Sequence, residues 1–319
     1  MSGIENTWEE FSNAEQVELS SRYLLTMALP RLVPDESSHS GTSWNHDFIV
    51  VDYADVESWT DFTESNLNGV FGRILSYATP WSQNLDGVFE QMNQPRLVHS
   101  EDDTDQLFLE NIAPVLRHSL DCTKGILSQA LQDKSVTGLQ IPSEKEATKI
   151  SLPQYLNDPK HFKKPNFPIY LPARSLPDRT PHKDIIFMIG ESARTEILSP
   201  ASFNNSHTYK AHGRIHLGKL AMYCKYGGSS LAFTMTHLGV TAFRFFEIPN
   251  GDGTFRMGAQ HVFAPWVPEC YDRPVPHGQD NYLSGAKAIW GLLMMSLTSE
   301  GRRLVERSQL RPINQWTPL

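Results

Sequence analysis

Two β-rich segments joined by a very short turn constrain the fold of this chain more than any other feature. Residues 231–236 and 240–247 are rich in β-branched and aromatic side chains, and only His237-Leu238-Gly239 separates them. This spacing predicts a β-hairpin. The glycine-rich turn at Asn250-Gly251-Asp252-Gly253 predicts a further strand near residues 257–263. The sequence therefore predicts consecutive strands from residue 231 onward.

Helical spacing of apolar residues appears on both sides of these strands. Residues 102–132 show it with interruptions at Pro114 and Gly125, which predicts two helices or one kinked helix. Between residues 103 and 263 the order is helix, strand, strand, helix, strand, strand. This order predicts an α/β fold of the mixed α+β kind rather than a doubly wound parallel sheet. The remaining expected elements are helices near 17–28, 65–78, 215–224 (closed at Gly227-Gly228) and 282–298, and strands at 46–51, 167–171 and 184–189.

The strands at 167–171 and 184–189 are close enough to pair as an antiparallel hairpin. In an antiparallel pair the numbers of facing residues have a constant sum. If Asn166 faces Glu191, residue 171 therefore faces residue 186. This register predicts that Asn166 and Glu191 lie at the same end of the hairpin.

Length and charge exclude several classes of protein. A chain of 319 residues holds one large core or two modest ones. No apolar run approaches the roughly 18 residues of a membrane span, and the first residues lack a signal-peptide pattern, so we expect an intracellular protein of nucleus or cytoplasm with no membrane partner. A net charge of −8 argues against a broadly basic surface, so any nucleic-acid contact is expected through a local patch. The three cysteines show no paired spacing that would indicate a zinc site.

Two segments resemble the second and third core strands of fungal PD-(D/E)XK nuclease-like proteins. They are Lys164-Pro165-Asn166-Phe167-Pro168-Ile169-Tyr170 and Ile186-Phe187-Met188-Ile189-Gly190-Glu191-Ser192-Ala193-Arg194. The family patterns read K-P-D-aromatic-x-x-Y and G-E-x-K. The resemblance implies a restriction-endonuclease-like core of a mixed sheet flanked by helices. It covers about 103–305, and leaves a mainly helical N-terminal extension (1–100) and a C-terminal tail (306–319).

The family chemistry needs two carboxylates to hold a divalent cation, normally Mg²⁺, and a lysine to stabilise the nucleophile or the developing charge. By resemblance, Glu191 is the second carboxylate, whereas Asn166 stands at the first carboxylate position and Ala193 at the lysine position. The expected catalytic set is Glu191, Asn166 and Lys219, with Lys219 supplying a cation from the next helix. The expected metal ligands are Glu191, Asn166 and Glu110. Other groups considered for these roles were Asp178, Asp184, Arg194 and Lys210.

Motifs of other enzyme classes are weaker. His212 and His216 have the i, i+4 spacing of a helical metal pair, although solvated histidines explain the same spacing. The sequence Gly190-Glu191-Ser192-Ala193-Arg194 lacks the final glycine of a nucleophile elbow.

Three hypotheses for function follow. The first is a nuclease-like protein with weakened or lost catalysis that acts as a binding or regulatory module. The second is an active Mg²⁺-dependent nuclease that cleaves DNA or RNA. The third is an accessory protein of a fungal specialised-metabolite gene cluster with no nucleic-acid role, which rests on family analogy alone.

Overall fold

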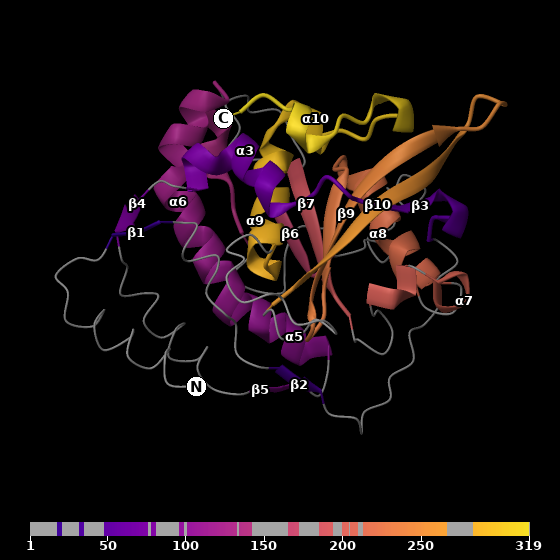
Figure 1. Cartoon of the computed structure of the whole chain (residues 1–319), viewed down its shortest axis with the longest axis horizontal. Coiled ribbons are helices and arrows are strands. Elements are labelled where there is room, and N and C mark those ends of the chain that lie inside the picture. The colour runs from indigo at the N-terminus through magenta and orange to yellow at the C-terminus, as the bar shows by residue number, and fades with distance from the viewer. Residues whose placement is uncertain are drawn as a thin grey trace, which may run out of the picture.

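The computed structural model describes residues 48–75, 101–132, 134–141, 165–171, 185–193, 200–203, 205–209, 213–266 and 283–318, together with four short strands (Figure 1). These strands form an antiparallel pair, β1–β4, and a parallel pair, β2–β5. Their bounds are β1 Glu18–Ser20, β2 Leu32–Pro34, β4 Ala78–Pro80 and β5 Arg96–Val98. The helix expected near 17–28 was therefore wrong at residues 18–20, and the rest of that range lies outside the described residues.

A mixed six-stranded sheet forms the centre of the molecule, with the order β3-β10-β9-β8-β7-β6. Pairs β7–β8 and β10–β3 are parallel and the other pairs are antiparallel. Helices pack on this sheet, so the expected mixed α/β class is confirmed. The strands are β3 Val56–Ser58, β6 Phe167–Leu171, β7 Ile185–Ser192, β8 Leu231–Met235, β9 Gly239–Pro249 and β10 Phe255–Pro265.

The β6–β7 hairpin has the predicted register at the end that matters for function. Phe167 pairs with Gly190 and Ile169 with Met188, which places Asn166 beside Glu191. After Ile169 the register shifts by one residue, so Leu171 pairs with Ile185 instead of residue 186. The prediction is thus confirmed at the Glu191 end and wrong beyond the irregularity.

Consecutive hairpins β8–β9 and β9–β10 confirm the strands predicted from residue 231 onward. The turn between β9 and β10 contains Gly253 at a φ of 84°. Glycine adopts this left-handed conformation without a Cβ clash. Asp252 reinforces the turn because its carboxylate accepts hydrogen bonds from the backbone and the hydroxyl of Thr254.

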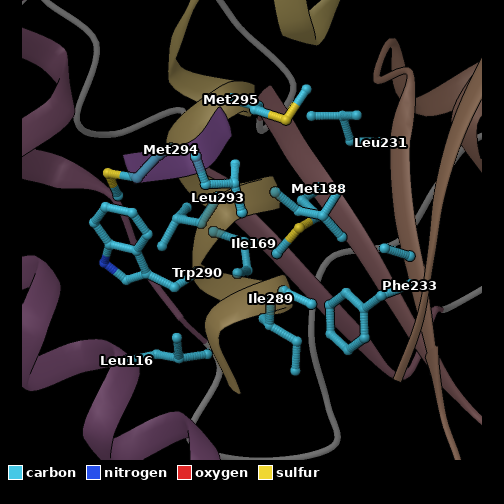
Figure 2. Close-up of a cluster of buried hydrophobic side chains, with 14 of the residues drawn as sticks. Leu116, Ile169, Met188, Leu231, Phe233, Ile289, Trp290, Leu293, Met294 and Met295 are labelled. Carbon is cyan, nitrogen blue, oxygen red and sulfur yellow. The ribbon is translucent and has the colours of Figure 1, made fainter. Parts of the chain in front are cut away.

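One face of the sheet packs against α9 (Gly285–Leu297), which lies within the larger apolar core. Figure 2 shows Trp290 and Leu293 of this helix between Leu116 of a neighbouring helix and the strand residues Met188 and Phe233. Helix α3 (Glu64–Leu75) joins the same core. Within the described residues, no helix combines the length and apolarity needed to cross a membrane.

The helical region predicted at 102–132 is continuous in direction but irregular in its winding. It consists of α5 (Glu101–Leu107), a π-helical turn, η3 (Phe108–Ile112), and α6 (Ala113–Ala130). Pro114 comes just after this turn and has no backbone N–H, so it cannot donate the helical hydrogen bond at its position. Gly125 lies within α6 and does not interrupt it. The expected break is therefore a change of helical winding before the proline.

The opposite face of the sheet carries α8 (Arg214–Gly227), which ends at Gly228 with a φ of 75°, as the double glycine predicted. The described part of the strand expected at 46–51 was wrong, because residues 48–51 have no strand pairing. These residues pack on α8 instead: a Cβ on Gly218 would lie 2.3 Å from the carbonyl oxygen of Ile49. The apolar run is thus explained by helix contact.

Parts of both flanking ranges, 1–100 and 306–319, belong to the core of the predicted 103–305 domain. Strand β3 pairs with β10, and Trp316 is 4% exposed. The guanidinium of Arg244 lies 6.0 Å from the ring of Trp59 and 5.7 Å from that of Trp316.

The shorter helices are α7 Ser206–Thr208, α10 Ser299–Arg302, η1 Tyr53–Asp55, η4 Lys134–Gly138, η8 Pro200–Phe203, η11 Arg307–Gln309 and η12 Ile313–Gln315.

Candidate functional site

The candidate site is built around Glu191, which lies near the end of β7 and is 0% exposed. Its side chain shares a face of the sheet with Ile189 and Ala193, toward α8. A carboxylate at such a position is stable in its charged form only if other groups replace the lost water. The contacts of Glu191 therefore decide what the site can do.

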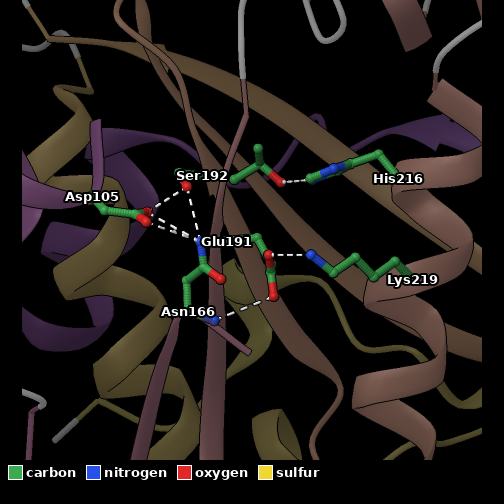
Figure 3. Close-up of polar contacts among 7 residues, drawn as sticks. Asp105, Asn166, Glu191, Ser192, His216 and Lys219 are labelled. Carbon is green, nitrogen blue, oxygen red and sulfur yellow. Dashed lines mark hydrogen bonds and ion pairs between the residues drawn. The ribbon is translucent and has the colours of Figure 1, made fainter. Parts of the chain in front are cut away.

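Protein groups occupy both oxygens of this carboxylate (Figure 3). The ammonium of Lys219, on α8, lies 2.7 Å from Oε2. The backbone N–H of Asn166, just before β6, donates to Oε1 at 3.3 Å. Two of the sequence-predicted residues thus contact Glu191 directly, one from the neighbouring helix and one from the neighbouring strand.

The side chain of Asn166 reaches a second carboxylate, Asp105 of α5. Its Nδ2 donates to the two carboxylate oxygens at 3.1 and 3.4 Å, and also lies 2.9 Å from Oγ of Ser192. The hydroxyl of Ser192 in turn donates to Oδ1 of Asp105. Asp105 is 2% exposed, so these donors stabilise a buried charge.

Figure 3 shows that Asp105 and Lys219 approach β7 from opposite sides, with Asn166 between them. The alternation of side chains along the strand explains this arrangement, because Glu191 and Ser192 are successive residues and point to opposite faces. The site is a chain of polar contacts that runs around the end of β7.

Sequence reasoning missed Asp105 and Ser192, and selected Glu110 as the acidic residue of this helical region. The carboxylate of Glu110 accepts a hydrogen bond from Nε2 of Gln106 at 2.6 Å. Asp105 lies two residues before the buried Leu107 and is itself buried. An acidic residue within the apolar stripe of the helix was the available signal.

The position at which the family pattern has its lysine is apolar here. Ala193 is 4% exposed, and its backbone N–H donates to the carbonyl of Met235 at 2.8 Å. Lys219, rather than a residue at position 193, therefore supplies the positive charge that contacts Glu191. Other candidates for these roles (Asp178, Asp184, Arg194 and Lys210) lie outside the described residues.

Two titratable groups beside the site are held in their neutral forms. Burial, and then the charge of Lys219, lower the pKa of His216 to about 3, and its Nε2 lies 2.7 Å from Oγ1 of Thr234. Burial, and then the charge of Glu191, raise the pKa of Tyr223, whose ring lies 5.8 Å below the Lys219 ammonium. His212, the expected partner of His216 in a metal pair, lies outside the described residues. No cluster of three or more acidic, histidine or cysteine side chains that could hold a metal occurs among the described residues.

We expect Lys219→Met to lower the free energy of unfolding by about 2 kcal/mol, because Glu191 would keep its buried position without its counter-ion. The loss is smaller than for a fully buried pair because Lys219 is 28% exposed. Chemical denaturation followed by circular dichroism measures it. The control is Lys225→Met on the same helix, whose side chain is exposed. Equal stability of both variants would show that the ion pair contributes nothing.

Comparison with known proteins adds no relative: no protein-family model, no curated protein and no solved structure matched the chain.

Proposed function

We propose that this chain is a PD-(D/E)XK nuclease-like protein that has lost or weakened phosphodiester cleavage and acts as a binding or regulatory module. The observation that supports this proposal is the pairing of both carboxylates with protein donors. Lys219 and the Asn166 backbone hold Glu191, while the Asn166 amide and Ser192 hold Asp105. These donors contact the carboxylate oxygens that would bind the metal ion in an active nuclease of this class.

The charges of the site support the same proposal. Asp105 and Glu191 contribute two negative charges and Lys219 one positive charge. Mg²⁺ binds oxygen ligands in octahedral geometry and gives up its water reluctantly. To bind at Glu191 it would have to displace the ammonium of Lys219 at 2.7 Å, and the amide of Asn166 adds no charge in compensation. The expected affinity for the metal is therefore low.

An active Mg²⁺-dependent nuclease is the second candidate, and one observation favours it. Lys219 lies at the carboxylate and is 28% exposed, so a cation from the helix is available where the strand has Ala193. Asp105 also adds a carboxylate that the strand motif does not contain. Under this hypothesis the metal binds only together with a nucleic-acid phosphate, which would supply the missing oxygen ligands.

Metal binding and cleavage distinguish the two candidates. We expect no heat of binding when Mg²⁺ or Mn²⁺ is titrated into the wild-type protein, and no cleavage of single- or double-stranded DNA or RNA in either metal. The compared variants are Glu191→Gln and Asp105→Asn, with Glu247→Gln as the control on another part of the sheet. Metal-dependent cleavage that both site variants lose and the control retains would overturn the proposal and establish the nuclease.

A further inference from the structure

A cavity of about 280 Å³ lies beside β3, on the part of the sheet away from β6. Strands β3, β9 and β10 and the short helix η8 contribute to it, together with the segment that leads into α3. Its size is just below the usual range for small-molecule sites, so only a small ligand would fit. The lining residues are Ser58, Trp59, Thr60, Phe62, Thr63, Phe203, Thr241, His261, Val262 and Phe263.

His261 is the polar group that distinguishes this cavity from a packing defect. It is 7% exposed, and its side chain has no hydrogen-bond partner within the described part of the chain. The ring of Phe203 lies 5.1 Å from the imidazole between centroids, a ring contact that satisfies neither nitrogen. Burial lowers the pKa of His261 to about 4, so the imidazole is neutral near pH 7. It then offers one donor and one acceptor.

A second polar group without a partner occurs in a lining residue, on the side of the larger core. The indole N–H of Trp59 is buried with no acceptor among the described residues. Buried polar groups are normally hydrogen-bonded, and each exception calls for an unobserved partner such as water or a ligand. The imidazole of His261 therefore gives the cavity a donor and an acceptor that a polar molecule could satisfy.

The rest of the lining defines the chemistry of that molecule. None of the ten lining residues carries a formal charge when His261 is neutral, so an ionised ligand would be desolvated without a counter-ion. Four aromatic side chains provide flat surfaces, and aromatic rings prefer stacked or edge-to-face partners. The four hydroxyl-bearing residues add adaptable hydrogen bonds at the edges.

We propose that this cavity binds a small, uncharged, planar heteroaromatic ring of the nucleobase type, with its ring nitrogens or exocyclic groups hydrogen-bonded to His261. Such a ring fits the volume, the aromatic walls and the paired donor and acceptor of a neutral imidazole. The proposal is independent of the fate of the nuclease-like site, since none of the cavity residues contacts Glu191 in the interactions described above.

The cavity and the candidate site nevertheless lie on one row of the sheet. Glu191 pairs with Thr234, Thr234 with Thr241, and Thr241 with Phe263. Directly paired residues point to the same face, so the row begins at the candidate site and ends in the cavity wall. His216 contacts the row at Thr234. A nucleobase in the cavity would thus share a face of the sheet with Glu191.

Titration calorimetry of adenine and of uracil into the full chain tests the proposal, with benzoate and cyclohexanol as charged and non-planar comparison ligands. We expect at least one base to bind, and binding to weaken about tenfold in His261→Phe, which keeps a ring of similar size and removes the hydrogen bonds. The matched control is His207→Phe, since His207 is exposed on α7. Circular dichroism checks that both variants fold.

Several outcomes would overturn the proposal. Absence of binding by either base shows that the cavity is not a site of this class. Equal binding by wild type and His261→Phe removes the role of the imidazole, and equal or tighter binding of benzoate or cyclohexanol removes the requirement for an uncharged planar ring. Base binding that persists in Glu191→Gln supports the cavity as a separate site, whereas loss in that variant but not in His261→Phe contradicts it.

Discussion

Replacing Lys287 with methionine is expected to lower the free energy of unfolding by about 3–5 kcal/mol. The ammonium of Lys287 lies 2.9 Å from Oε1 of Glu64, and the two side chains are only 4% and 3% exposed. Methionine fills the same space without the charge, so the carboxylate would remain buried without its cation. The pair links α9 to the first turn of α3, and denaturant unfolding followed by circular dichroism measures the loss.

A double variant separates the ion pair from packing. Glu64→Gln/Lys287→Met removes both charges, and we expect it to recover much of the stability lost in Lys287→Met. The control is Lys124→Met, because Lys124 pairs with Asp121, whose side chain is 64% exposed, and should cost less than about 1 kcal/mol. If Lys287→Met is as mild as this control, the buried pair is not important for stability.

Acidification from about pH 7 to about pH 5 is expected to destabilise the fold by roughly 3–4 kcal/mol through two histidines. Burial holds the pKa of His216 at about 3 and that of His261 at about 4, whereas an unfolded imidazole titrates near 6.5. Between these values the unfolded chain binds protons that the folded chain does not. Stability is therefore complete above pH 6.5 and falls as the pH decreases toward the folded values.

Urea unfolding at several pH values measures this dependence. His261→Phe removes one of the two titrations, so the pH dependence of its stability should be about half as steep, with His207→Phe unchanged from wild type. A wild-type stability that is constant between pH 7 and pH 5 would show that the two imidazoles are protonated in the folded state.

Local sequence signals predicted those parts of the fold that depend on neighbouring residues. The β8–β9 hairpin follows from a three-residue separation, and the end of α8 follows from the freedom of Gly228. The facing of Asn166 and Glu191 followed from a simple antiparallel register. In these cases the residues that give the signal are close in sequence to the residues that form the contact. The prediction therefore needs little information about the rest of the molecule.

Contacts between distant segments were not predictable in the same way. The apolar residues 48–51 have a strand-like composition, but they pack on α8, and β3 follows a few residues later. Composition cannot distinguish a strand that pairs in the sheet from a segment that packs on a helix, because both bury the same kinds of apolar side chain. The register shift after Ile169 likewise has no signal in the two strand segments themselves.

The candidate site shows the same division. The structure brings together Glu191, Asn166 and Lys219, three residues that the sequence singled out. Asp105 was missed although it lies within the apolar stripe of α5, because Glu110, in the π-helical turn that follows, was predicted instead. A π-helical turn changes the phase of every later side chain, so counting by 3.6 residues does not apply across it.

The parallel pairing of β3 with β10 has a consequence for how the protein is made. Glu57 and Gln260, which share a side-chain hydrogen bond across this pair, are 203 positions apart in the chain. During synthesis, β3 leaves the ribosome long before its partner exists, while the β8–β10 meander and α8 can pair soon after they emerge. The edge of the sheet next to the His261 cavity is therefore completed late, and newly made chains should remain protease-sensitive there until β10 has folded.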